Sequence, residues 1–114
     1  MEPKDVTEIS VASDYSPYPA GRYPTDGAFN GQNFRDKVLL PLLKEAKVVR
    51  VNIDGVALLP SSFWEEVWGG MIRESRISKE DALARFEITT SEDDLATYVD
   101  MAWRFLNDAK PKAA

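Results

Sequence analysis

The 114-residue sequence contains no cysteine and no histidine. Without cysteine there is no disulfide framework and no thiolate chemistry. The absence of histidine removes the commonest general base and metal ligand. No apolar run approaches the ~20 residues needed to span a bilayer, and the opening stretch MEPKDVTEIS has no apolar signal core. These absences favour a soluble cytoplasmic protein without metal or cofactor.

Positive charge is also scarce, with 14 basic against 19 acidic residues and a net charge of −5. Phosphate binding needs clustered positive charge, so a nucleic-acid partner and an anionic membrane surface are both disfavoured. The hydrophobic fraction of 44% and three tryptophans indicate a globular chain. We expect one domain over residues 1–114, with an ordered core at about 6–108 and frayed, polar ends.

Three segments read as strands. Residues 6–11 alternate between apolar and polar, residues 47–54 place Val49, Val51 and Ile53 on one face, and residues 85–89 form a short strand. A weak edge strand is predicted near Gly21–Tyr23, because the surrounding prolines exclude an inner strand.

Three segments read as helices. The first is capped by Asn30 and runs to about Ala46, with a bend at Pro41. The second starts at Ser61 or Ser62 and ends near Ser75. The third is capped by Ser91 and runs to about residue 108, with one apolar face. That face comprises Leu95, Val99, Ala102 and Leu106.

Strands that alternate with helices of this length predict an α/β fold. We expect a mixed sheet of about four strands with three helices and a parallel core, in which the N-terminal strand pair is antiparallel. The 47–54 strand should lie inside the sheet, with Ser61 and Ser62 facing water just beyond its end.

The stretch DGVALLPSSFWEEVWGG (residues 54–70) carries the most information. Ser62 stands three residues before Glu65, which is the spacing of a capping box. A helix N-terminus also favours anions, so the same hydroxyls suit a phosphate or another ligand. The large apolar residues of this helix either pack in the core or form a partner surface, and Gly69 and Gly70 suggest a close backbone approach.

The segments TDGAFNGQNFRDKVLLPLL, VNIDGV and SSFWEEVWGG together resemble the STAS-like family of unknown function, which is related to STAS domains of bacterial anti-sigma-factor antagonists. The resemblance covers roughly residues 7–90. It implies a STAS-like fold and a non-enzymatic, regulatory protein-interaction module. Pro60 and Phe63 stand where STAS antagonists have aspartate and glycine.

In STAS antagonists the second serine of the pair is phosphorylated by a histidine-kinase-like ATPase, and Ser62 is the matching position. The resemblance therefore implies Ser62 as phosphoacceptor and a histidine-kinase-like ATPase or an anti-sigma factor as partner. The interaction surface that we expect comprises Ser61, Ser62, Trp64, Glu65 and Asp54.

Other readings stay open. The same helix start suits a nucleotide or small-anion sensor, and Arg22 and Arg35 are weak anion-binding candidates that could equally pair with acidic neighbours. Asp26, Asp54 and Glu65 could form a carboxylate cluster, although Asp26 and Asp54 each precede glycine, as turn formers do. Neither phosphate-cradling motif is present. Because the sequence offers no catalytic set, we expect no catalytic residue. Wide apolar faces leave room for a homodimer.

Overall fold

The computed structural model describes residues 4–112. In this range the sheet has three strands in the order β1-β2-β3, and both pairings are parallel. The α/β class and the parallel core are confirmed, but the sheet is not mixed and has three strands instead of about four. The strands are β1 (Lys4–Ser10), β2 (Ala46–Asn52) and β3 (Phe86–Thr89).

The prediction of an edge strand at Gly21–Tyr23 is wrong, because carbonyls of this segment accept hydrogen bonds from the first residues of a helix. The backbone N–H groups of Gly31 and Gln32 donate to the carbonyls of Gly21 (2.9 Å) and Arg22 (2.9 Å). The first N–H groups of a helix have no partner within the helix. Gly21 takes a φ of +86°, which favours glycine. The segment therefore caps a helix and pairs with no strand in the described part of the chain.

Five helices occur in residues 4–112 when the continuous run 31–43 is counted once and the two three-residue 3-10 helices, η1 and η3, are left out. Four of them have seven residues or more, against the three helices expected. Within the same residues, none is long and apolar enough to cross a membrane. In chain order the helical segments are α1 (Val11–Asp14), η1 (Pro24–Asp26), α2 (Gly31–Asn33), η2 (Phe34–Leu39), α3 (Leu40–Leu43), α4 (Ser61–Arg73), α5 (Lys79–Arg85), η3 (Asp93–Leu95) and α6 (Ala96–Asp108).

The helical run 31–43 shows how the chain accommodates Pro41. Asn30 caps it as predicted, because its side chain accepts the N–H of Asn33 at 2.9 Å. The middle segment η2 is a π-helix, in which the N–H of Leu40 donates to the carbonyl of Arg35. This wider turn stands directly before Pro41, which lacks an N–H and crowds the preceding turn of an α-helix. The run ends at Leu43, and Ala46 already belongs to β2.

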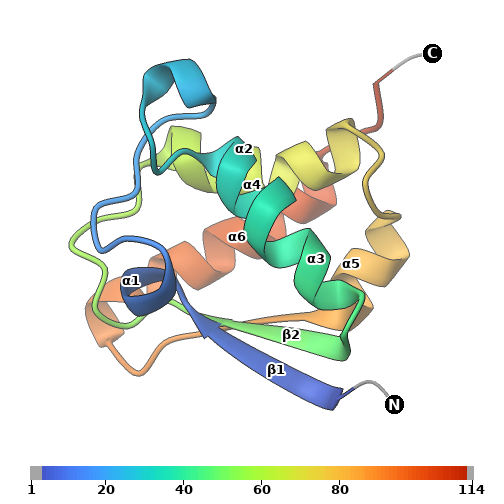
Figure 1. The fold of residues 1–114 in the computed structure, drawn as a ribbon, viewed down its shortest axis with the longest axis horizontal. Coiled ribbons are helices and arrows are strands. Elements are labelled where there is room, and N and C mark those ends of the chain that lie inside the picture. The colour runs from blue at the N-terminus through green and yellow to red at the C-terminus, as the bar shows by residue number, and fades with distance from the viewer. Residues whose placement is uncertain (1–3, 113–114) are drawn as a thin grey trace.

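The helices of the two crossovers lie on one face of the sheet (Figure 1). The connection from β1 to β2 and the connection from β2 to β3 each lead to the next strand in the same direction across the sheet. Because parallel crossovers of this kind are right-handed, both connections lie on the same side of the sheet. The opposite face carries exposed side chains such as Val6, Glu8 and Glu87. This strand order also has no point where its direction reverses, which is where open α/β sheets commonly bind ligands.

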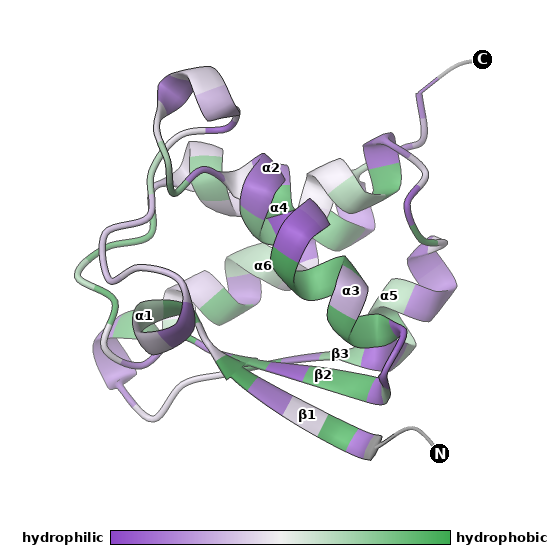
Figure 2. Cartoon of the chain, viewed as in Figure 1, coloured by the Kyte–Doolittle hydropathy of each residue, from purple (hydrophilic) through white to green (hydrophobic). Residues whose placement is uncertain are grey.

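The core lies between the inner sheet face and α4. Val49, Val51 and Ile53 are fully buried, which confirms the predicted inner face of the 47–54 strand. Hydrophobic and hydrophilic residues are interspersed along β1 (Figure 2). Ile9, which pairs with Val51, is buried on the inner face, whereas Val6 is 41% exposed on the outer face. On α4, Trp68 meets Phe86 of β3 edge-on, with ring centroids 5.2 Å apart.

Two helix predictions near the C-terminus need correction. Ser91 does not cap the last helix, because α6 begins at Ala96 and the Ser91 hydroxyl donates to Asp54. Helix α5 was not predicted at all, although Ser78 caps it by accepting the N–H of Asp81 at 3.1 Å.

The frayed ends that the sequence predicts include residues 1–3 and 113–114, which lie outside the described residues. At the N-terminal side, β1 already begins at Lys4. Lys112 donates its N–H to the carbonyl of Arg73 at 3.0 Å, so the chain after α6 is attached to α4.

Candidate functional site

The candidate site lies where the chain leaves the inner strand β2 and enters α4. Gly55 has a φ of +88°, and the N–H of Val56 donates to the carbonyl of Ile53 at 3.3 Å, so the chain turns directly after the strand. Ser61 is exposed and Ser62 is partly exposed. The structure therefore places both serines, as predicted, at a surface beyond the end of the inner strand.

The predicted capping box of Ser62 and Glu65 is wrong. Helix α4 begins at Ser61, its N-cap is Pro60, and no side chain caps it. The extended φ of −56° and ψ of 141° at Pro60 suit the entry to a helix. Glu65 instead turns to arginines, with Oε1 at 2.5 Å from Nη1 of Arg22 and Oε2 at 2.7 Å from Nη1 of Arg73. The serine hydroxyls are thus not used as side-chain caps.

Trp64 is not part of an interaction surface, which corrects the sequence prediction. Its side chain is 0% exposed, and its indole N–H donates to the carbonyl of Tyr98 at 2.7 Å. Phe63, which follows the serine pair, is also 0% exposed and stacks beside Trp64 with ring centroids 6.3 Å apart. The two aromatic residues fix the first turn of α4 in the core.

Asp54 holds the loop after β3 against the end of β2. Its Oδ1 accepts the Thr90 hydroxyl (2.6 Å) and the Ser91 N–H (2.8 Å), and its Oδ2 accepts the Ser91 hydroxyl (2.7 Å). These hydrogen bonds, led by that from Thr90, lower the pKa of Asp54 to about 2. Asp54 therefore joins two strand ends and has a structural task independent of any partner.

A network of ion pairs runs along the side of α4. Nη1 of buried Arg35 lies 2.6 Å from Oε2 of Glu66, and Arg35 also pairs through both Nε and Nη2 with Asp36, at 2.8 Å and 3.2 Å. Although burial opposes the charged form of Glu65, hydrogen bonds from Arg73 and Arg22 lower its pKa overall.

The same network explains the adjacent glycines of α4. A Cβ at Gly70 would collide with the Arg35 guanidinium, and a Cβ at Gly69 would collide with the Glu65 carboxylate. The close approach expected from the glycines is therefore made by charged side chains. Backbone comes close only at Gly31, whose Cβ would stand 2.6 Å from the Phe63 carbonyl oxygen.

Arg22 and Arg35 already have carboxylate partners. Arg22 bonds to Glu65 and Glu66, and these carboxylates raise its pKa, the Glu65 hydrogen bond most. Arg35 is 3% exposed. Anion binding by either arginine stays a prediction, and an added anion would have to compete with these partners.

The three acids considered as a carboxylate cluster do not come together. Oδ2 of Asp26 accepts the N–H groups of Arg22 and Tyr23, both at 3.0 Å, while Asp54 and Glu65 have the separate partners described above. No group of three or more carboxylates, cysteines or histidines able to hold a metal ion occurs among residues 4–112.

Sequence reasoning missed two exposed apolar side chains, one on the loop that leads into Ser61 and one on a loop joined to it. Leu58 is 48% exposed and Tyr18 is 69% exposed. Their neighbours Ala57 and Pro17 join the two loops, since the N–H of Ala57 donates to the Pro17 carbonyl at 2.8 Å. We call the surface formed by Tyr18, Leu58, Ser61 and Ser62 the Ser61 surface. The turn-rich composition around Tyr18 signalled an exposed loop, but it did not indicate the loop to which this one is joined, because residues 19–57 lie between Tyr18 and Leu58.

Comparison with known families agrees with this architecture. The family model described as STAS-like domain of unknown function (DUF4325) matches residues 30–96, which is more than half of the chain. The chain therefore belongs to this STAS-like family, and the resemblance stated from the sequence is confirmed. No curated protein and no solved structure matched the chain.

Proposed function

We propose that this STAS-like domain is a non-enzymatic regulatory module that binds a partner protein through the Ser61 surface. The observation that carries the proposal is the exposure of Leu58 and Tyr18, 48% and 69%, on two loops joined by the hydrogen bond from Ala57 to Pro17. The loop of Leu58 leads directly into the exposed Ser61 at the start of α4. Contiguous exposed apolar groups rimmed by polar ones mark protein-interaction sites. Tyrosine in particular is enriched in the buried centres of interfaces.

The proposed partner is a histidine-kinase-like ATPase of the bacterial cytoplasm, the class that acts on STAS antagonists, and Ser62 is the proposed point of control. Ser62 is the second residue of α4, where free backbone N–H groups favour an added negative charge. A phosphate on its oxygen would add up to about two negative charges at the centre of the Ser61 surface. Such a charge opposes the docking of an apolar partner surface, so phosphorylation would release the partner.

Affinity purification from the native host tests this proposal. The tagged wild-type domain is compared with Leu58→Asp, Ser62→Asp and Ser62→Ala, and the retained proteins are quantified by mass spectrometry. We expect Leu58→Asp and Ser62→Asp to lose the same partner, because each places a negative charge in the Ser61 surface. Ser62→Ala should retain it.

Leu83→Asp is the matched control, because Leu83 is 40% exposed but lies on α5. This variant should retain the partner at the wild-type level. Identical protein sets for wild type, Leu58→Asp and Ser62→Asp would contradict the proposal. Circular dichroism of each variant establishes that the fold is intact.

A further inference from the structure

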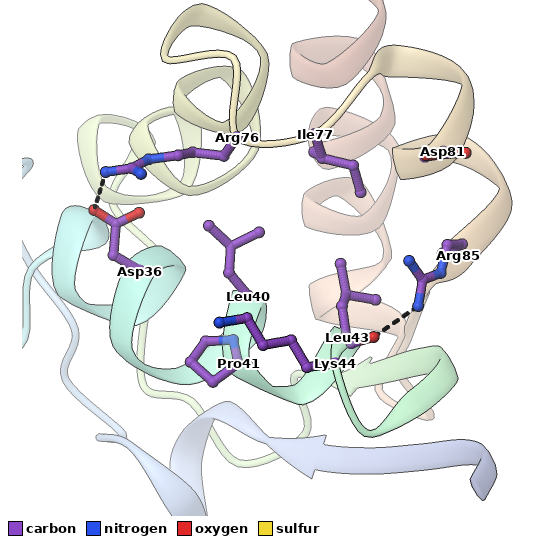
Figure 3. A pocket seen from close by; sticks show the side chains of 9 residues that line it. All are labelled: Asp36, Leu40, Pro41, Leu43, Lys44, Arg76, Ile77, Asp81 and Arg85. Carbon is purple, nitrogen blue, oxygen red and sulfur yellow. Dashed lines mark hydrogen bonds and ion pairs between the residues drawn. The ribbon is translucent and has the colours of Figure 1, made fainter. Parts of the chain in front are cut away.

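A groove of about 530 Å³ opens between α3 and α5, away from the Ser61 surface (Figure 3). Its apolar part contains Leu40, Leu43 and Ile77, all half-buried and packed against the core, together with the exposed Pro41. Pockets that hold small molecules commonly enclose about 300–1,000 Å³ and are mostly apolar, with a few polar groups. The groove has the size of such a site, and its lining is divided between apolar and charged side chains.

The wall of the groove at α5 is held in place by Arg85. Its Nη2 donates to the carbonyls of Leu43 (2.7 Å) and Ala46 (2.9 Å), and its Nε donates to that of Lys47 (3.0 Å). The bond to Leu43 satisfies a carbonyl at the end of α3, where the helix leaves its last acceptors unpaired, and the other two carbonyls belong to the start of β2. The groove is therefore a fixed feature of the fold, and the charge of Arg85 is partly used by these carbonyls.

The charged groups of the groove favour an anion. Lys44 is exposed, and the Arg76 side chain is 54% exposed. In Figure 3 they lie on opposite sides of Leu40. Asp36 faces the same groove, but Arg35 binds both of its carboxylate oxygens, and Arg76 forms a longer ion pair with it at 3.9 Å. The other lining acid, Asp81, is opposed by three cationic residues, Lys44, Arg76 and Arg85.

We propose that this groove binds a small amphipathic carboxylate, whose apolar body lies on Leu40, Leu43 and Ile77. Its carboxylate would reach Lys44 and Arg76, the two cations that have flexible side chains and open access to solvent. Burying the apolar body supplies the binding free energy, since each methylene removed from water contributes about 0.8 kcal/mol. The cations select the charge of the head group.

Titration of the ¹⁵N-labelled full chain with sodium decanoate tests the site, with amide resonances followed by NMR. Decanol and decylamine serve as probes of the same chain length that carry no charge or a positive charge. We expect decanoate to shift the amides of Leu40, Leu43 and Ile77 in a saturable way. Decylamine should bind at least about fivefold more weakly.

Variants that reverse the charge of a groove residue provide a second test of the proposed site. Lys44→Glu and Arg76→Glu should each weaken decanoate binding about fivefold, since both side chains are solvent-exposed and their loss leaves the core intact. Lys37→Glu should leave binding unchanged, because Lys37 is also exposed on η2 but lies outside the groove lining.

Equal binding of all three probes, or decanoate binding that no groove variant weakens, would show non-specific adsorption and overturn the proposal. Absence of saturable shifts would overturn it as well. Binding only by an acidic peptide, and not by decanoate, would replace the small-molecule site with a protein-docking groove and would equally refute the proposal.

Discussion

The Arg35 guanidinium and the Glu66 carboxylate lie 2.6 Å apart inside the protein, where their side chains are only 3% and 4% exposed. Arg35 Nη1 also donates to the backbone carbonyl of Glu66 at 3.0 Å. This pair fastens η2 to α4, the helix whose start carries the Ser61 surface. Removal of one partner of such a pair leaves a buried charge without compensation.

Arg35→Met should therefore lower the free energy of unfolding by about 3–5 kcal/mol, measured by urea denaturation. Arg50→Met is the control, because Arg50 pairs with Glu87 at 2.7 Å while both side chains are 40% or more exposed. The control should cost less than about 1 kcal/mol. Equal losses in the two variants would show that the buried pair has no special role.

Alanine substitutions at the two α4 glycines should have different effects on stability, because one new methyl group would meet exposed side chains and the other a buried one. Alanine gains about 1 kcal/mol over glycine in a helix. At Gly69 the colliding groups, Glu65 and Arg73, are partly exposed and can move, so Gly69→Ala should be close to neutral. At Gly70 the collision is with buried Arg35, so Gly70→Ala should destabilise by roughly 2 kcal/mol. Thermal unfolding of both variants would refute this reading if Gly70→Ala were the more stable.

Protonation of Asp54 should contribute to the loss of stability of the domain in acid. Its pKa is about 2 in the fold against an ordinary value of 3.8. A lowered pKa stabilises the fold above the unfolded-state value, and this contribution is lost as the pH falls from 3.8 toward 2. Asp54→Asn should be less stable than wild type at neutral pH, with a difference that shrinks over this interval.

Urea midpoints measured as a function of pH check the Asp54 prediction. Asp108→Asn, at an exposed position near the end of α6, provides the control. A constant difference between Asp54→Asn and wild type across the acid range would contradict it.

Arg22 should hold the loop that carries Tyr18. Its contacts with Glu65 and Glu66 attach residues 20–22 to α4, and those residues accept or donate backbone hydrogen bonds next to α2. Arg22→Gln should speed hydrogen exchange at the amides of Ala20, Gly31 and Gln32, since opening of the segment breaks their bonds. Arg104→Gln, an exposed arginine on α6, should leave these amides unchanged.

The amino-acid pattern predicts the elements whose signal is local. The strands around Val49 and Ile88, the Asn30 cap and the extent of α4 all follow from periodicity and capping. Helix α5 was missed although Ser78 and the acids after it give a local start signal. The parallel pairing of β1 and the position of Tyr18 beside Leu58 could not be predicted, because both depend on contacts between distant parts of the chain.

The capping roles predicted for two serines were wrong, for a physical reason. Ser62 and Ser91 both have spacings suited to capping, but Pro60 already provides the entry to α4, and Asp54 offers Ser91 a charged acceptor at 2.7 Å. A charge-assisted hydrogen bond is stronger than a neutral one. Local spacing therefore identified residues at helix starts without identifying their partners.

Site-specific photocrosslinking in the native host tests the central claim most directly. A benzophenone amino acid replaces Tyr18 in the Ser61 surface or, as a control, Leu83 on α5. The account predicts a crosslinked partner protein at position 18 that disappears when Leu58→Asp is added, and no such product at position 83. An equal yield of the same product at both positions, or a yield at position 18 that Leu58→Asp does not reduce, would contradict it.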